Sequence, residues 1–170
     1  MDLTPKRAAD SATEMVQVVL PNDANPLGFI LGGTVMHLID IAGAIASFRH
    51  TRTRVVTAAV DDLQFLHPIK VGDLIILKAH VTCAFTTSLE VQVDVFSEET
   101  LTGQRRLTSQ AFLTFVAIGE RGERVTVPPL LAETDTERLV ATQAHERRAA
   151  RLRRKTMAAG SETSFDTRAS

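Results

Sequence analysis

The chain has 170 residues, of which 44% are hydrophobic and 23% charged, a balance that fits one globular domain with a core of its own. Its formal net charge of -1, an aromatic content of 5% and the absence of tryptophan and tyrosine argue against binding to nucleic acid or to an anionic membrane. The single cysteine, Cys83, excludes an internal disulfide, and since no signal-peptide core or membrane-length apolar run is present we expect a cytoplasmic protein.

The first third of the chain is expected to hold a strand, a loop and a long helix. Residues 1–11 form an N-terminal extension, and alternation of apolar and polar residues predicts a strand over residues 12–20. Prolines and other turn formers predict a loop at 21–28. Between residues 33 and 49, apolar side chains cover almost the whole helical circumference, which predicts a buried helix with a sheet wrapped around it.

The middle of the chain is expected to form the rest of the sheet. Segments rich in β-branched and aromatic residues, separated by turn formers, predict strands at residues 55–66, 74–85, 88–97 and 106–118. No helical pattern lies between these strands, which favours hairpin connections and an antiparallel meander. The main domain is therefore expected to span residues 12–132.

A surface helix is expected to follow the domain. Thr134 or Asp135 caps a helix that runs to about Lys155, with acidic residues early and arginines late, an order that suits the helix dipole. Its polarity predicts a helix on the surface or one that reaches a neighbouring subunit, with the basic residues from Arg147 onward in solvent. Residues 133–155 thus form a basic helix, and residues 156–170 are expected to be a disordered tail.

Asp40 is the first candidate for chemistry, because it stands in the middle of an otherwise apolar helix where a carboxylate is costly to bury. It is either a structural carboxylate with satisfied partners or a general base or nucleophile. The Gly32-Gly33 pair lies where the loop enters this helix, at the same end as Asp40, and is either an ordinary turn or an oxyanion hole. Asn25, in the preceding loop, is either a turn residue or a polariser of a carbonyl group. Together the three make a coherent set for hydrolysis.

Two further groups of side chains are candidates for sites. His37 lies three residues before Asp40 on the same helix face, but no third ligand has a recognisable spacing, so no metal site is predicted. Asp61 and Asp62 are neighbours on a predicted strand and are expected to point to opposite faces. They are therefore not expected to act together on one group, and one of them is expected to face the site or a subunit interface.

These segments closely resemble the acyl-CoA thioesterases of the hotdog fold. The resemblance extends from about residue 13 to residue 129 and rests on several runs in the family's order: 21–28 (PNDANPLG), 32–33 (GG), 39–46 (IDIAGAIA), 56–62 (VTAAVDD), 65–68 (FLHP), 71–73 (VGD) and 87–91 (TSLEV). It implies an α+β hotdog fold, in which an antiparallel sheet wraps a long central helix. It also implies that two subunits form a continuous sheet, with active sites at their interface, in a dimer or a trimer of dimers.

The resemblance further implies an enzyme that hydrolyses fatty acyl-CoA to free fatty acid and CoA, with no cofactor beyond the CoA of its substrate. Asn25 would polarise the thioester carbonyl, a backbone N–H of Gly32 or Gly33 would stabilise the oxyanion, and Asp40 of the opposing subunit would activate water or attack directly. Contacts with the substrate are implied for Thr57, Asp61, Thr87, Ser88, Arg52 and Arg54. Taken only as residue types, the threonine and serine at 87–88 are also ordinary turn formers, and the two arginines are also ordinary surface residues.

The sequence departs from related patterns at two places. The stretch 29–31 is wholly apolar where the family often has a shorter, more polar one, which leaves the acyl preference open. Pro26-Leu27-Gly28 is similar to the Asn-Pro-Leu-His run of hotdog hydratases, but Gly28 replaces the histidine that serves as their base. A non-catalytic acyl-CoA-binding protein is the main alternative to an enzyme, and a hotdog enoyl-CoA hydratase is the less favoured one.

Overall fold

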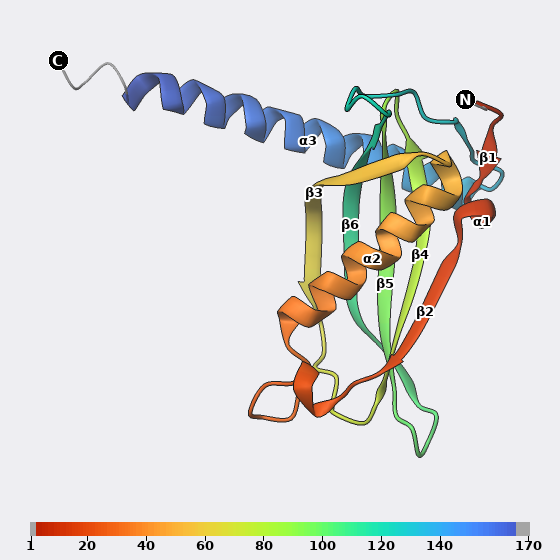
Figure 1. Ribbon diagram of the computed structural model, residues 1–170, viewed down its shortest axis with the longest axis vertical. Helices are drawn as coiled ribbons and strands as arrows, with labels where there is room; N and C mark the ends of the chain where they lie inside the picture. Colours follow the sequence, from red (N-terminus) through yellow and green to blue (C-terminus); the bar gives the residue numbers. More distant parts are fainter. Residues whose placement is uncertain (1–2, 166–170) are drawn as a thin grey trace.

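One long helix lies across one face of an antiparallel sheet in the computed structural model, which describes residues 3–165 (Figure 1). This helix is α2 (Gly32–Thr51), and the C-terminal helix α3 (Asp135–Phe165) begins behind the sheet and projects beyond it. The predicted fold class, α+β with a long central helix and a C-terminal helix, is confirmed.

The sheet has five strands in the order β2-β4-β5-β6-β3. Every strand expected from the sequence is present: β2 (Thr13–Val18), β3 (Arg54–Phe65), β4 (Leu74–Ala84), β5 (Ser88–Glu98) and β6 (Arg105–Ile118). The predicted meander is correct for β4, β5 and β6 but wrong for β3, which pairs with β6 at the far edge of the sheet. Because α2 crosses the sheet before β3 begins, the chain returns to the edge opposite β2.

The N-terminal residues pack on the domain through three short elements. The strand β1 (Lys6–Arg7) pairs in parallel with β7 (Leu130–Leu131), and the single turn α1 (Ala8–Ser11) follows it. The buried Ser11 hydroxyl oxygen accepts a hydrogen bond from the backbone N–H of Val81 on β4 at 3.0 Å. After β2, a 3-10 turn (Pro21–Asp23) leads into the predicted loop.

The core lies between α2 and the sheet. Gly43 permits the close packing, since a Cβ at this position would lie 2.9 Å from the ring of Phe115 on β6. The prediction that α2 is covered all round is correct only for its sheet side. Met36 and Phe48, on other parts of the helix surface, are nearly half exposed.

The last helix extends further than the sequence indicated. It continues to Phe165 instead of ending near Lys155. The remainder of the predicted tail, residues 166–170, lies outside the described residues. Within the described part of the chain, no helix combines the length and the apolar character needed to cross a bilayer.

Candidate active site

The side-chain amide of Asn25 is held in one orientation by its own loop. Its Oδ1 accepts hydrogen bonds from the backbone N–H groups of Leu27, at 2.9 Å, and Phe29, at 3.2 Å. The backbone N–H of Asn25 donates to the carbonyl oxygen of Phe29 at 2.8 Å. Within residues 3–165 no acceptor is hydrogen-bonded to the Asn25 amide nitrogen, so this group is available as a donor for a bound molecule.

A pocket of about 370 Å³ opens beside this amide. It brings together two of the predicted catalytic residues, Asn25 and Gly32, and the rest of its lining is mainly apolar: Phe29, Ile30, Val35, Phe65, Leu66, His67, Pro68, Ile69 and Ser109. Such a lining suits a hydrocarbon chain held next to a few polar groups.

The start of α2 supplies backbone donors at the same place. Gly32 and Gly33 are the first two residues of the helix, and the residue before them, Leu31, provides no side-chain cap. Their N–H groups have no acceptor in the described chain, and both glycines are exposed. A Cβ on Gly32 would lie 3.5 Å from the ring of Phe65, inside the mouth of the pocket. The amides are thus open to an oxyanion at the positive end of the helix dipole.

Asp40 lies elsewhere on the same helix. It is half-buried, and its Oδ1 accepts a hydrogen bond from the Thr57 hydroxyl of β3 at 2.6 Å. With a rise of 1.5 Å per residue, Asp40 is about 10–12 Å along the helix axis from Gly32 and Gly33. Asp40 thus lies about two turns into the helix, as its spacing in the sequence predicted, but it does not line the pocket that contains Asn25. One chain does not bring Asp40 onto a carbonyl group held by Asn25.

Five large apolar side chains are exposed on the two elements that carry Asp40 and Thr57. They are between 44% and 54% exposed and come from α2 and β3: Met36, Phe48, Val56, Val60 and Phe65. The strand β3 is also an edge of the sheet: one side pairs with β6, and among residues 3–165 no strand pairs with the other side. An unpaired edge flanked by apolar side chains is suited to pairing with another strand.

Residues 27–104 match the family model described as the thioesterase superfamily. The chain is 39% identical over 137 residues to the uncharacterized acyl-CoA thioester hydrolase YkhA of Bacillus subtilis, an alignment that covers 81% of this chain and 80% of that protein. This chain belongs to the thioesterase superfamily.

Solved structures agree with the assignment of this chain to the thioesterase superfamily. An apo-hexameric acyl-CoA thioesterase is 38% identical with a TM-score of 0.85, covering 89% of this chain and 97% of that one. An acyl-CoA hydrolase from Staphylococcus aureus, solved with butyryl coenzyme A and coenzyme A, is 33% identical with a TM-score of 0.82, covering 97% and 99%. The chain spans only 25% of the mouse acetyl-coenzyme A thioesterase and 36% of the human cytosolic acyl coenzyme A thioester hydrolase.

Variants of the Staphylococcus aureus enzyme give a further point of comparison. Three of its solved forms replace one asparagine, one aspartate or one threonine by alanine. The successive intervals between these positions are 15 and 17 residues, the same as those separating Asn25, Asp40 and Thr57 here.

The other residues expected to contact the substrate lie away from the Asn25 pocket of the thioesterase. Thr87 lies in the β4–β5 turn and Ser88 is the first residue of β5, where the Ser88 carbonyl oxygen accepts the N–H of Phe85 at 2.7 Å. Arg52 and Arg54 line a separate open depression of about 920 Å³ at the end of α2, which also contains Arg121 and two glutamates, Glu120 and Glu123. The single chain does not bring these four predicted residues to the catalytic candidates, and their roles stay predictions.

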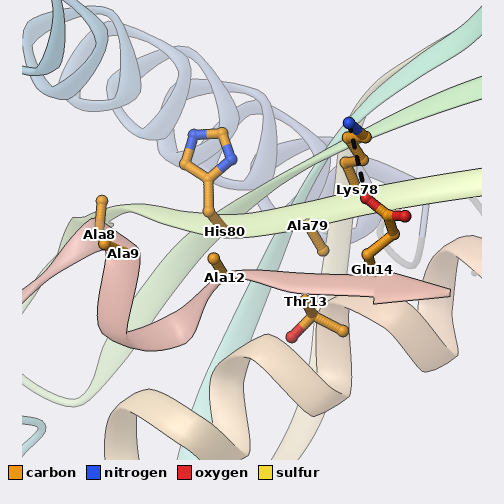
Figure 2. Close-up of a pocket in the computed structure, with 8 residues that line it drawn as sticks. All are labelled: Ala8, Ala9, Ala12, Thr13, Glu14, Lys78, Ala79 and His80. Carbon is orange, nitrogen blue, oxygen red and sulfur yellow. Dashed lines mark ion pairs between the residues drawn. The ribbon is translucent and has the colours of Figure 1, made fainter.

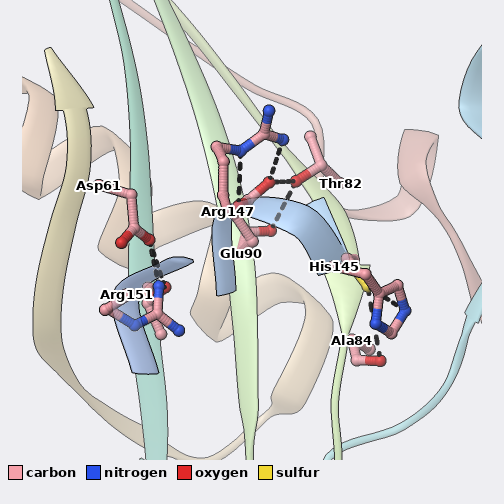
Figure 3. A network of polar contacts seen from close by, with 9 residues as sticks. Asp61, Thr82, Ala84, Glu90, His145, Arg147 and Arg151 are labelled. Atoms are coloured by element: carbon pink, nitrogen blue, oxygen red, sulfur yellow. Dashed lines mark hydrogen bonds and ion pairs between the residues drawn. The ribbon is translucent and has the colours of Figure 1, made fainter. Parts of the chain in front are cut away.

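Asp61 occupies the face of the sheet opposite α2. Its side chain is only 2% exposed and forms an ion pair with Arg151 of α3, while the Thr114 hydroxyl donates to Oδ2 at 3.0 Å (Figure 3). The register places Asp62 opposite Phe112, whose ring lies 3.8 Å from the guanidinium of Arg147 on the same helix α3. The expectation that the two acids face opposite sides is wrong, because register shifts interrupt the alternation of β3.

The prediction that the basic end of the last helix is solvated is wrong for the two arginines that face the sheet. Arg147 forms a two-pronged ion pair with Glu90 of β5, with 2.7 Å to Oε1 and 3.0 Å to Oε2, and Thr82 also donates to Oε1 at 2.8 Å (Figure 3). The Glu90 side chain is 1% exposed. Sequence reasoning missed this network because its partners lie 57 and 90 residues apart and carry no local pattern.

A cysteine and histidine pair on this face is not a second catalytic centre. The Cys83 Sγ lies 3.6 Å from the Nε2 of His145. Burial, with a smaller contribution from the Glu90 charge, raises the pKa of the Cys83 thiol to about 11. The thiolate that would act as a nucleophile is therefore strongly disfavoured at neutral pH.

Two remaining features hold none of the predicted catalytic residues. A pocket of about 380 Å³ lies between α1, β2 and β4, where His80 and the ion pair of Lys78 and Glu14 stand among small alanines (Figure 2). His37 is exposed and has no hydrogen bond to Asp40 in the described residues. Across the same residues no cluster of three metal-ligating side chains occurs.

Proposed function

We propose that this chain is an acyl-CoA thioesterase that hydrolyses fatty acyl-CoA to free fatty acid and CoA at a site completed by a second copy of the chain. The observation that carries the proposal is the separation of two half-sites. Asn25 and the glycine amides form one half beside an apolar pocket, and Asp40 with Thr57 forms the other on two elements that expose apolar side chains. A second subunit, paired along the free edge of β3, would supply the missing half to each site.

The chemistry follows from the donors and acceptors of each half. The Asn25 amide nitrogen and the N–H of Gly32 or Gly33 donate to the thioester oxygen, whose negative charge grows as the tetrahedral intermediate forms. The Asp40 carboxylate of the partner either takes a proton from the attacking water or attacks the carbonyl carbon itself. In both cases the carbon–sulfur bond breaks, CoA leaves as its thiolate, and a proton then restores the thiol. If Asp40 is the nucleophile, the acyl group is left on it as a mixed anhydride, which water hydrolyses to the free fatty acid and the restored carboxylate.

Thr57 has a different role in this proposal from the one expected. Its hydroxyl donates to Asp40 and so orients the carboxylate. The spacing shared by Asn25, Asp40 and Thr57 with the three positions changed in the Staphylococcus aureus enzyme supports treating them as one functional set.

The family and the site together support an oligomer without further cofactors. The acyl-CoA thioesterase with a TM-score of 0.85 to this chain is a hexamer. The exposed apolar side chains of α2 and β3 suit contact with another subunit. Thioester hydrolysis by a carboxylate and hydrogen-bond donors needs only water and the acyl-CoA. We propose the cytoplasm as the compartment, which is compatible with a single unpaired cysteine.

The test is steady-state turnover on a series of acyl-CoAs of increasing chain length, for the unchanged protein and for Asp40→Asn. We expect the variant to lose activity by about 10²-fold or more, since it loses the proton acceptor or nucleophile. Asp62→Asn, which removes an exposed acid from β3, is the matched control and should retain turnover.

Two results would reject the proposal. Full activity of Asp40→Asn would contradict the proposed role of Asp40 as proton acceptor or nucleophile. Tight binding of acyl-CoA by the unchanged protein without hydrolysis at any chain length would favour the non-catalytic binding protein instead.

A further inference from the structure

The edge strand β3 carries two features that face opposite sides of the sheet. Thr57 donates to Asp40 on α2, and Asp61 contacts Arg151 on α3. In a regular strand, residues four apart point to the same face. Something in β3 must therefore reverse the direction of the side chains between these two residues.

The strand contains two register shifts, and the first of them, between Thr57 and Ala59, produces the reversal. Thr57 pairs with Phe115 and Ala59 with Thr114, so Ala58 is an extra residue in β3. Val60 pairs with Leu113 and Asp62 with Phe112, so Asp61 is a second extra residue. Extra residues interrupt the ladder of hydrogen bonds and leave the local direction of side chains less fixed by pairing alone.

The contacts of Asp61 supply the constraint that the ladder lacks. Arg151 donates to Asp61 Oδ2 and, at 2.7 Å, to the Thr114 hydroxyl, which itself donates to the same carboxylate oxygen at 3.0 Å. Thr114 is the β6 residue paired with Ala59, between the two shifts. The triangle of Asp61, Thr114 and Arg151 thus ties the irregular part of β3 to both β6 and α3.

This triangle depends strongly on Arg151. The other carboxylate oxygen, Oδ1, is buried without a hydrogen-bond partner in the described residues, and the Asp61 side chain is 2% exposed. Without the guanidinium, a buried carboxylate would keep a single hydroxyl donor, so the segment would rearrange to reach water. That rearrangement would begin four residues from Thr57.

We propose that Arg151 is a positioning residue for thioester hydrolysis: through Asp61 it fixes the bulged segment of β3 and thereby the Thr57 hydroxyl against Asp40. The inference rests on the proposed function, because it assigns Asp40 and Thr57 to the active site. It makes the C-terminal helix part of the catalytic apparatus even though Arg151 does not touch the substrate.

The test is a double-mutant cycle between Arg151→Met and Thr57→Val, measured as kcat and KM on the preferred acyl-CoA. Each single variant should lower kcat about 10-fold, because the transition state loses the stabilisation of roughly one hydrogen bond. KM should stay within about 2-fold of the unchanged protein. The double variant should also be about 10-fold slower and not about 100-fold, because both changes remove the same contact. Arg151→Lys should recover most of kcat.

The matched control is Glu90→Met with Arg147→Met, which removes the other buried ion pair between α3 and the sheet without leaving a charge behind. This pair joins β5 to α3 and does not contact the β3 segment between Thr57 and Asp61, so its removal should leave kcat unchanged and combine independently with Thr57→Val. If Arg151→Met does not fold, Asp61→Asn with Arg151→Met removes the pair without a buried charge and takes its place in the cycle.

Independent effects of Arg151→Met and Thr57→Val, or a lowered melting temperature with unchanged kcat, would overturn the inference. Loss of the oligomer in Arg151→Met by sedimentation velocity would overturn it too, since the effect would then act through assembly. These outcomes differ from failure of the proposed function, in which Asp40→Asn retains full turnover.

Discussion

At the scale of single residues, the Asn25 amide has a defined polarity. Two backbone N–H groups donate to its Oδ1, which leaves the amide nitrogen as the group that faces outward. A reacting carbonyl next to it would therefore meet a donor. The loop that holds the amide is short, and its constraint is local to residues 25–29.

Asn25→Asp tests this polarity with almost no change of shape. The carboxylate can still accept both backbone N–H groups, so the loop should fold, but an acceptor replaces the donor. We expect kcat to fall by about 10²- to 10³-fold, the effect of removing one oxyanion donor. The measurement is kcat together with the melting temperature, and Asn22→Asp in the same loop is the control. A fully active Asn25→Asp would contradict the assigned role.

Residue chemistry predicted part of the candidate site. Asp40 could be selected because a carboxylate is unusual in an apolar helix, whereas Asn25 and Gly32 are ordinary turn residues and became candidates only in combination with it. The separation of Asp40 from the glycines along the helix, about 10–12 Å, follows from the sequence spacing, but its position outside the pocket that contains Asn25 does not. The position of Asp61 could not be predicted either, because no signal in the sequence marks Ala58 and Asp61 as extra residues in β3.

At the scale of elements, α3 is joined to the sheet by buried ion pairs. Glu90 is 1% exposed, and Arg147 is 22% exposed. The strands and helices could be predicted from periodicity, but these contacts depend on how α3 crosses the sheet. Their effect on the free energy of unfolding is set mainly by the cost of leaving one buried charge without its partner.

Arg147→Met should destabilise the protein by about 3–5 kcal/mol, because it leaves the Glu90 carboxylate buried without its cation. Glu90→Met with Arg147→Met should be close to neutral, since two apolar side chains replace the pair. Urea unfolding of both variants measures the difference. Equal destabilisation of the two would show that packing of α3, and not the unpaired charge, dominates.

Two histidines, the buried His50 and the half-buried His80, are expected to make the stability of the fold depend on pH. Burial is the main cause that lowers the pKa of His50 and of His80 below 6.5, although the bond between His50 and the Pro128 carbonyl acts in the opposite direction. The unfolded chain therefore binds these protons first as the pH falls. Their contribution to stability is present above about pH 6.5 and is lost as the pH falls through the lowered pKa values.

We therefore expect the melting temperature to fall between pH 7.5 and pH 5, and His50→Gln to reduce this dependence. His37→Gln, at an exposed position, is the control. The measurement is thermal unfolding across the pH series. The same slope in His50→Gln and the unchanged protein would exclude His50 as a source of the effect.

At the scale of the whole molecule, the proposed site is divided between two chains. The fold predicted from the resemblance is confirmed, but the sequence places Asn25 and Asp40 only 15 residues apart and cannot say from which chain each one acts. The structure of one subunit indicates the division, because Asp40 lies outside the pocket that contains Asn25.

Mixed oligomers of Asn25→Ala and Asp40→Ala test the division. Each variant alone should be inactive, whereas a mixed pair contains one site with both residues intact. After random reassembly of equal amounts, about one quarter of the wild-type rate should return. The readout is acyl-CoA turnover before and after mixing, with Asp40→Ala reassembled alone as the control. No recovery in reassembled oligomers would place both residues in the same chain.

The two arginines that fasten α3 are four residues apart, so they lie about one turn apart on one stripe of the helix. Arg147 must reach Glu90 on β5, and Arg151 must reach Asp61 on β3. Together these contacts fix the rotation of α3 about its axis and its position along that axis. One residue inserted within α3 between Asp135 and Arg147 would rotate the stripe by roughly 100° relative to the start of the helix and shift it by about 1.5 Å. Evolution can thus vary the side chains of this helical stretch far more freely than its length.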